Sequence, residues 1–460
     1  MSSDTPHPIE LAFLGAAGTV TGSKYLLSTN KVRVLLDCGL FQGYKALRKR
    51  NWCEPGFEPA SLAAVVLTHA HLDHSGYLPR LCELGFQGPV YCTPGTRDLL
   101  QVLLPDSGFL QEEEARHAAL NGYSRHETPL PLYTRAAAER CLRQVVTVPF
   151  GESFSAASGF EMGFSRAGHI VGSASVAVRV AGTRLTFSGD VGRPVDPIMK
   201  PAARLAPADY LIIESTYGDR PHPVEDPAIA IARVVNETVA RGGVLVVPAF
   251  AVGRAQQLLH LLAQLKAACT IPDLPVFLDS PMAIDATDIY LAHREEHRLS
   301  REECQAMYRG ATFAHTSDDS KAIDARSGSM VVISASGMAT GGRVLHHLSR
   351  FLPDPRNAVL LVGYQSPGTR GRSLADGSDE LKIHGRYVSV RAKVEQIAGL
   401  SAHADYRELI DLLRQSELSP KRVFVTHGEP AAADALRRKL RDALGWDAVV
   451  PEDRSSFALS

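Results

Sequence analysis

The stretch Thr68-His69-Ala70-His71-Leu72-Asp73-His74 places three imidazoles and one carboxylate close together in the chain. The apolar run 63–67 before it predicts a buried strand, and residues 75–81 after it predict a turn that enters a helix. Such a loop lies at the carboxyl end of a strand, where open α/β sheets bind ligands. Imidazole nitrogen and carboxylate oxygen suit a divalent ion such as zinc. The spacing favours two metal positions over one, and a surface loop that is merely rich in histidine is the weaker alternative.

The composition is that of an ordinary soluble globular protein, with 460 residues, 45% of them hydrophobic and 22% charged. This length predicts two domains. Lys and Arg number 49 against 50 Asp and Glu, so attraction for a nucleic acid has to come from a local basic strip and from metals. The chain shows no secretory signal, no apolar run of membrane-spanning length and no CxxC pair. These features predict a cytoplasmic protein without membrane contact and argue against a thiolate zinc site.

Acidic and histidine side chains recur at the ends of other predicted strands. Asp37 ends an apolar strand, His169 stands between glycines, and Asp190 follows another apolar strand. Asp37 is either a turn-capping residue or an acceptor that orients a histidine ligand. A carboxylate has two oxygens and can bridge two cations, and Asp190 is the candidate for that role. Glu214 and His427 end two further buried strands and extend the pattern.

A different texture begins after the prolines within 221–227. Strands and helices then alternate from 243 to 363, which implies a mostly parallel sheet covered by helices and hence an inserted α/β domain. Within it, His293-Arg294-Glu295-Glu296-His297 has the spacing of a zinc helix but lacks the glutamate that HExxH requires, so we expect a solvent-facing helix. His346-His347 likewise predicts a helix surface.

Two segments of this inserted domain are candidates for contacts with substrate phosphate. Ser336 and Gly337 begin a glycine-rich stretch that follows a strand and opens a helix, whose free amides suit a phosphate. Arg370 and Arg372 carry guanidiniums that suit phosphate oxygens. A plain glycine-rich helix start and a solvated loop explain the two patterns equally well.

From Asp37 to His427, these motifs resemble the metallo-β-lactamase superfamily with a β-CASP insertion. That group includes the cleavage-and-polyadenylation endonuclease and bacterial and archaeal ribonucleases. The resemblance implies an α/β fold in which residues 1–215 and 376–460 form an αββα sandwich. Residues 216–375 would form the inserted β-CASP domain.

The same resemblance assigns roles to the side chains at the strand ends. The three β-CASP motifs fall on Glu214, His403 and His427. A histidine at the third motif goes with RNA-processing members, whereas DNA-repair members carry a valine there, so His427 implies an RNA substrate. The resemblance also implies two Zn²⁺ per chain, the first bound by His69, His71, His169 and Asp190, and the second by Asp73, His74, His427 and the shared Asp190.

We therefore expect a zinc-dependent ribonuclease, an endonuclease of RNA processing or decay, that hydrolyses phosphodiester bonds with a hydroxide activated by two metals. Asp73 would orient the nucleophile, His403 would protonate the leaving oxygen, and Glu214 would hold that imidazole in the required tautomer. The alternatives are a DNA nuclease of the same family and a small-molecule metallo-hydrolase, which would not need the insertion. Since no KH-like region precedes the first strand, we expect homodimerisation or another partner to supply part of the grip on RNA.

Overall fold

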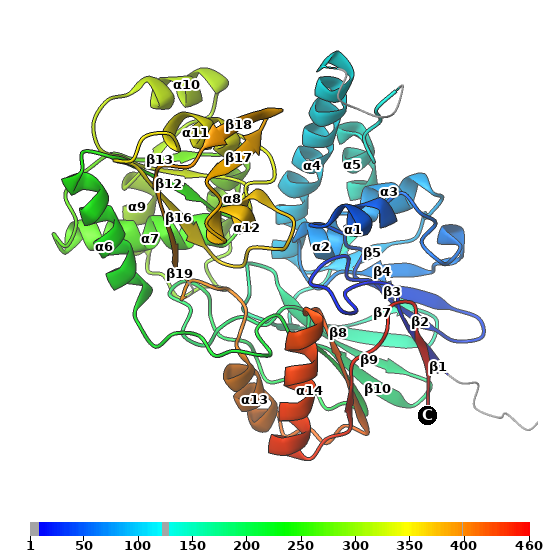
Figure 1. The fold of residues 1–460 in the computed structure, drawn as a ribbon. Helices are drawn as coiled ribbons and strands as arrows, with labels where there is room; N and C mark the ends of the chain where they lie inside the picture. Colours follow the sequence, from blue (N-terminus) through cyan, green and yellow to red (C-terminus); the bar gives the residue numbers. More distant parts are fainter. Residues whose placement is uncertain (1–8, 122–127, 398) are drawn as a thin grey trace, which may run out of the picture. The chain divides into compact units, whose positions relative to one another are not determined.

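The computed structural model describes residues 9–121, 128–397 and 399–460 (Figure 1). The chain divides into two compact units, one made of Met1–Pro221 with His403–Ser460 and the other of His222–Ala402. The second unit is therefore an insertion between two stretches of the first. None of the helices in the described ranges has both the length and the apolar character that a membrane span requires.

Within the described residues, the first unit contains two seven-stranded sheets. Both are mixed, because antiparallel neighbours at one side give way to parallel neighbours at the other. The first sheet has the order β22 (Ser456–Leu459), β1 (Ile9–Phe13), β2 (Tyr25–Ser28), β3 (Arg33–Leu36), β4 (Ala64–Val66), β5 (Val90–Cys92), β6 (Val145–Thr147). The second has the order β21 (Ala448–Val449), β20 (Arg422–Thr426), β11 (Tyr210–Glu214), β10 (Thr183–Phe187), β9 (Ala174–Val180), β8 (Phe160–Arg166), β7 (Ser153–Ala157).

Strand β11 shows why several of these strands are apolar along their whole length. Ile212 belongs to the core between the two sheets. Leu211 and Ile213 point the other way and join a second core with Leu409 and Leu436 of the covering helices. A strand that is buried on both faces has no polar face and gives a continuous apolar run.

Helices cover the outer face of each sheet and complete the αββα sandwich that the sequence predicted (Figure 1). The second sheet is covered by α13 (Tyr406–Gln415) and α14 (Pro430–Leu444). The helices of the first unit are α1 (Lys45–Arg50), α2 (Leu72–Ser75), α3 (Leu78–Glu83), α4 (Pro94–Asn121), α5 (Arg135–Cys141), α13 (Tyr406–Gln415) and α14 (Pro430–Leu444).

The second unit is built on a six-stranded sheet in which every strand pair is parallel. The predicted parallel α/β domain is thus confirmed. The sheet has the order β14 (Thr312–Phe313), β13 (Val276–Asp279), β15 (Met330–Ser334), β12 (Val244–Pro248), β16 (Ala358–Val362), β19 (Lys393–Ile397). Around it lie α6 (Pro227–Ala240), α7 (Arg254–Ala267), α8 (Pro281–Ala292), α9 (Arg301–Arg309), α10 (Ser317–Ala325), α11 (Val344–Phe351), α12 (Arg370–Ala375) and the hairpin of β17 (Glu380–Ile383) and β18 (Arg386–Ser389).

The last strand of this sheet decides where the second unit ends. Strand β19 pairs with β16 over five residues, with Leu360 opposite Glu395. This pairing groups the chain as far as Ala402 with the second unit, whereas the sequence analysis places residues 376–460 in the first domain. The alternation of apolar and polar residues in such a strand shows that it is half-buried, but not which sheet it joins.

Two sequence predictions about histidines in the second unit are wrong. Helix α8 ends at Ala292, so the segment with zinc-helix spacing is a turn, and His297 is buried with Nε2 3.0 Å from Tyr290 O. His346 is exposed on α11 as predicted, but its neighbour His347 is fully buried. His347 is buried because two aspartates supply partners for both ring nitrogens, and these aspartates are distant in sequence.

Candidate metal centre

The HxHxDH residues follow directly on the end of β4 at Val66. His69 and His71 lie on the loop, and Asp73 and His74 lie in the single turn of α2. A sharp loop followed by one helical turn points neighbouring side chains in different directions. The four side chains consequently contribute to two groups of ligand atoms and not to one.

The segment after β3 fixes the backbone of this loop. A Cβ on Gly39 would lie 1.6 Å from the carbonyl oxygen of Asp73, so only glycine permits this approach. The backbone N–H of Cys38 donates to His74 O at 2.6 Å. Ser23 N–H donates to Asp73 O at 2.9 Å from a third segment. The backbone that carries Asp73 and His74 is therefore held by segments remote in sequence.

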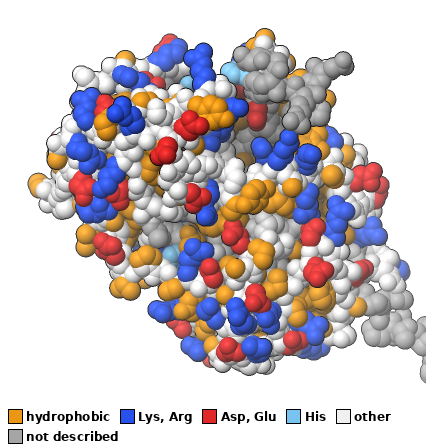
Figure 2. Space-filling model, in the orientation of Figure 1, with side chains coloured by type: hydrophobic (Ala, Val, Ile, Leu, Met, Phe, Trp, Pro, Cys, Tyr) orange, Lys and Arg blue, Asp and Glu red, His pale blue; other side chains and the backbone are white. Residues whose placement is uncertain are grey.

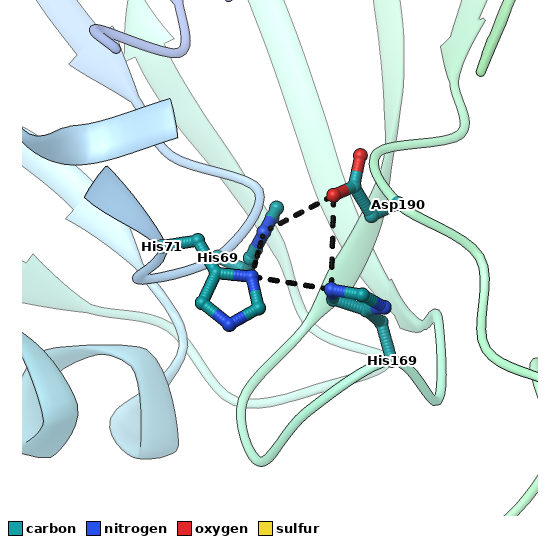
Figure 3. A group of neighbouring side chains, drawn as sticks. All are labelled: His69, His71, His169 and Asp190. Carbon is teal, nitrogen blue, oxygen red and sulfur yellow. Dashed lines mark hydrogen bonds and ion pairs between the residues drawn. The ribbon is translucent and has the colours of Figure 1, made fainter. Parts of the chain in front are cut away.

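The first group of potential ligand atoms belongs to His69, His71, His169 and Asp190 (Figure 3). Nε2 of His69 and Nε2 of His169 lie 3.1 Å and 3.2 Å from Nδ1 of His71. Oδ2 of Asp190 lies 3.5 Å from Nε2 of His69 and 3.7 Å from Nε2 of His169. Tetrahedral zinc with bonds of about 2.05 Å would separate its ligand atoms by about 3.3 Å. The four atoms have the spacing of such a site.

The second group is formed by Asp73, His74 and His427. Oδ2 of Asp73 lies 3.5 Å from Nε2 of His427. Oδ1 of Asp190 lies 3.3 Å from Nε2 of His74 and 3.6 Å from Nδ1 of His427. Asp190 follows β10, and its carboxylate turns one oxygen toward each group. The structure therefore brings all seven sequence-predicted ligands together.

Two buried atoms of the second group have no hydrogen-bond partner among the described residues, namely Oδ1 of Asp190 and Nε2 of His427. Burying a polar atom without a partner is unfavourable, and such atoms are rare in folded proteins. A divalent cation would satisfy both atoms, and nitrogen and carboxylate donors are those that zinc accepts. The residues present fit a metal.

Burial keeps two imidazoles of the first group neutral. It lowers the pKa of His69 well below its usual value and the pKa of His71 to about 4. Neutral imidazole is the form that binds a metal. At neutral pH these two side chains can act as ligands without first losing a proton.

Asp37 and Thr68 hold two of the histidines in place. Oδ2 of Asp37 lies 2.7 Å from Nδ1 of His74. Thr68 donates its N–H and its hydroxyl to Asp37 at 2.8 Å and 2.9 Å, and its Oγ1 lies 3.1 Å from Nδ1 of His69. Asp37 therefore acts as an acceptor that orients a histidine, which is one of the two interpretations that the sequence allowed. Thr68 carries no distinguishing signal in the sequence, because a threonine before a histidine is common.

Two residues of the centre, Asp37 and His427, adopt a left-handed backbone conformation, with φ of 56° and 48°. Side chains other than glycine rarely adopt it, and it is retained where the surroundings enforce it. Asp37 N–H donates to Val66 O at 2.9 Å, and His427 N–H donates to Ala16 O at 2.7 Å. These bonds hold both backbones while the side chains reach their partners.

Glu214 and His403 form a pair beside the two groups. Nδ1 of His403 lies 3.1 Å and 3.2 Å from the carboxylate oxygens of Glu214. Val191 N–H donates to the same carboxylate at 2.6 Å. Burial opposes protonation of His403, but the carboxylates of Glu214 and Asp190 raise its pKa above the usual value. An imidazolium in this position can donate a proton.

Thr216, which the sequence analysis does not single out, connects Glu214 with His427. Its hydroxyl donates to Oε2 of Glu214 at 2.7 Å, and its Oγ1 lies 3.1 Å from Nδ1 of His427. Thr216 thereby contributes to the orientation of the His427 ring, whose other nitrogen, Nε2, lies 3.5 Å from Oδ2 of Asp73.

Comparisons with known proteins agree with this geometry. A Beta-lactamase superfamily domain matches residues 32–241, a Beta-Casp domain matches residues 255–374, and a Zn-dependent metallo-hydrolase RNA specificity domain matches residues 387–451. Ribonuclease TTHA0252 of Thermus thermophilus is 37% identical over 93% of this chain and 94% of its own length. The chain belongs to the β-CASP family of the metallo-β-lactamase superfamily. The family that the sequence motifs predicted is thus confirmed. The predicted enzyme class, a metal-dependent hydrolase, is confirmed as well.

Two further relatives are similar to this chain in sequence, and one solved structure is similar to it in fold. Transcription termination factor FttA of Methanocaldococcus jannaschii is 33% identical over 94% of this chain and 69% of its own length. The factor of the same name from Methanosarcina mazei is 31% identical with the same coverage. A protein of unknown function from Enterococcus faecalis shares the fold, with a TM-score of 0.54 and 14% identity over 98% of this chain and 100% of its own.

The four candidate phosphate contacts lie in the β-CASP region. The two that were expected at the start of a helix do not lie there. Helix α11 begins at Val344, so Ser336 and Gly337 lie on the preceding loop. Arg370 donates from Nε to Lys382 O at 2.7 Å. Arg372 donates to Asp376 at 2.9 Å. Both guanidiniums have contacts within the protein, and a phosphate role for these four residues stays a prediction.

Proposed function

We propose that this chain is a zinc-dependent ribonuclease that hydrolyses RNA phosphodiester bonds with two zinc ions per chain. The observation that carries the proposal is the orientation of Asp190. Its Oδ2 faces the nitrogens of His69 and His169, and its Oδ1 faces His74 and His427. A carboxylate whose two oxygens face two different ligand groups suits a pair of neighbouring cations.

In this proposal the two ligand groups hold one ion each. When bound, the ions would lower the pKa of a water molecule and neutralise negative charge on the phosphate. The first ion would take His69, His71, His169 and Oδ2 of Asp190, and the second would take Asp73, His74, His427 and Oδ1 of Asp190.

The remaining chemistry belongs to three side chains of the β-CASP enzyme. Asp73, with 22% of its side chain exposed, is positioned to accept a hydrogen bond from the attacking nucleophile. His403, with 18% exposed, engages Glu214 through Nδ1, so it would protonate the leaving oxygen from Nε2. Glu214 would hold that imidazole in the required orientation and stabilise its charged form.

Two findings support RNA over other substrates. The C-terminal part of the chain matches a Zn-dependent metallo-hydrolase RNA specificity domain, and one relative over nearly its full length is a ribonuclease. DNA and small esters remain the competing substrates in the test. An active site that needs only metal and hydroxide would accept these as well, so the substrate comparison is decisive.

The test uses the full chain reconstituted with zinc. Labelled RNA, DNA of the same sequence and a chromogenic ester are incubated with and without a chelator, and metal content is measured by elemental analysis. We expect RNA cleavage that the chelator abolishes, and two zinc ions per chain. Preferential hydrolysis of DNA or of the ester would contradict the proposal.

A matched pair of variants tests the metal assignment. Asp190→Ala should empty both sites and abolish RNA cleavage, because it removes a ligand from each. Asp209→Ala is the control, since this carboxylate pairs with Arg184 at 3.2 Å and belongs to neither ligand group. If Asp190→Ala retained two ions, the shared-carboxylate arrangement would be wrong.

A further inference from the structure

Helix α1 carries three cations that have no carboxylate at ion-pair distance in the part of the chain that the structure describes, namely Lys45, Arg48 and Lys49. Arg184 of the same unit, by contrast, is paired with Asp209 at 3.2 Å. None of the residues in α1 is buried. With a formal net charge of −1 for the whole chain, this helix is a local concentration of positive charge.

Two exposed aromatic rings flank these cations. Tyr44 directly precedes α1 and is 56% exposed, and Trp52 follows its end and is 53% exposed. Lys45 and Arg48 are three residues apart, which places them on one face of the helix. Figure 2 shows Lys and Arg side chains gathered on the surface of the first unit where Figure 1 draws α1.

The opposite side of the helix is anchored to the first unit. Asn51 accepts from Phe41 N–H at 2.9 Å and donates to Phe41 O at 2.8 Å. The Arg50 guanidinium lies 3.9 Å from the centre of the Phe41 ring and bonds to Asp453 at 2.7 Å. These contacts fix the helix and leave the side with the unpaired cations and the two aromatic rings facing outward.

The same segment leads back to the metal centre. It starts at Asp37, which bonds His74, and Leu40 N–H donates to Leu72 O at 2.8 Å. Tyr44 is seven residues from Asp37, which is at most about 25 Å of extended chain. Even at the axial rise of about 3.4 Å per nucleotide of a stacked strand, an RNA of about 20 nucleotides spans that distance.

We propose that the outward side of this segment, called the α1 face and consisting of Tyr44, Lys45, Arg48, Lys49 and Trp52, binds single-stranded RNA. The cations pair with phosphates, and bases stack on the two rings. Unpaired cations interleaved with exposed aromatic rings are the combination that single-stranded nucleic acid binds without strict sequence preference. The inference rests on the proposed ribonuclease function and identifies where the substrate strand is held outside the metal centre.

The test measures binding and cleavage separately. The variants are the charge-neutral triple Lys45→Gln/Arg48→Gln/Lys49→Gln and the single Trp52→Ala, each in the zinc-reconstituted full chain. Binding of an RNA of about 20 nucleotides, longer than the estimated span, is followed by fluorescence anisotropy over a range of salt concentrations. We expect the triple variant to lower the slope of log K against log salt by about 2. Trp52→Ala should weaken binding about tenfold.

Steady-state kinetics give the second readout. Both variants should raise KM for the long RNA while leaving kcat and the hydrolysis of bis(p-nitrophenyl) phosphate unchanged, because that probe is too small to reach the α1 face. The matched control is Arg437→Gln/Arg438→Gln/Arg441→Gln on α14, which removes the same charge from arginines that already have carboxylate partners. The control should bind RNA as the wild type does.

Each other outcome has a defined meaning. Wild-type affinity and salt slope in the triple variant would overturn the inference, as would a wild-type protein that does not bind single-stranded RNA. Unchanged RNA affinity with loss of binding to vesicles of anionic phospholipid would overturn it in favour of a membrane surface. RNA binding through the α1 face without cleavage would refute the ribonuclease proposal and leave the binding face intact.

Discussion

Oδ2 of Asp37 lies 2.7 Å from Nδ1 of His74. The other nitrogen of that ring, Nε2, lies 3.3 Å from Oδ1 of Asp190. The acceptor at Nδ1 fixes the tautomer and the orientation of the imidazole, so that Nε2 is the atom presented to the second ligand group. A residue 37 positions before its partner thereby influences a metal site that it does not enter.

Replacing this acceptor tests its role. Asp37→Asn preserves the shape and tolerates the left-handed φ of 56°, but removes the negative charge that supports His74. We expect metal affinity at the second site to fall by about 10- to 100-fold, measured by competition with a chromophoric chelator. Asp209→Asn, which removes a surface carboxylate paired with Arg184, is the control. Equal affinity in Asp37→Asn and wild type would contradict the role.

His403→Ala separates proton donation from metal binding. Since Nδ1 of His403 lies 3.1 Å from Glu214 but 3.9 Å from the ligand Asp190, we expect RNA cleavage to fall by at least about 100-fold while bound zinc stays near the wild-type level. Glu214→Gln should lower cleavage less, because the imidazole keeps a hydrogen-bond partner. Metal content by elemental analysis, alongside single-turnover cleavage, decides the point. Simultaneous loss of zinc in His403→Ala would exclude the proton-donor role.

The Thr216 hydroxyl is expected to act on His427. Thr216→Val removes the hydroxyl that contacts Nδ1 of His427 and donates to Glu214, without a large change in volume. We expect zinc affinity to fall about tenfold, as for other residues that orient a ligand. Thr216→Ser keeps the hydroxyl and should restore affinity. If the serine variant bound zinc as weakly as the valine variant, the hydroxyl alone would not account for the affinity, and if valine bound zinc as tightly as threonine, the hydroxyl would have no role.

His347 makes the stability of the second unit depend on pH. Burial disfavours its charged form, but the hydrogen bonds that its ring donates to the carboxylates of Asp279 and Asp324, each at 2.7 Å, raise its pKa to about 9. The unfolded value is about 6.5, so the contribution of about 3 kcal/mol is fully present below pH 6.5 and is lost as the pH rises through 9.

Urea unfolding of the wild type at pH 6 and at pH 9.5 should therefore show a loss of stability at the higher pH. His347→Leu should be less stable at pH 6 and should lose most of this pH dependence, because Asp279 keeps Arg343 at 2.7 Å as its charged partner. His346→Leu, on the exposed side of the same helix, is the control and should behave as the wild type. An unchanged pH dependence in His347→Leu would show that other groups cause it.

The sequence determined the family, the αββα and parallel-sheet architecture and the seven candidate ligands. It could do so because an apolar strand that ends in Asp37, Asp190 or His427 buries a polar group, which requires a partner at the same edge of a sheet. The dense HxHxDH loop then identified a metal as that partner. These signals are local, so they can be recognised in the sequence without knowledge of the tertiary structure.

Only the tertiary structure decided how the oxygens of Asp190 divide between two groups, that Thr216 connects Glu214 with His427, and that His347 is buried. Each depends on atoms from segments far apart in sequence: Asp279 lies 68 residues from His347, and Thr216 lies 211 residues from His427. A periodic pattern shows which side of a helix or strand is apolar, but not which distant polar group meets it. The partners of a buried polar atom are fixed by how the chain packs, and that information lies in the fold.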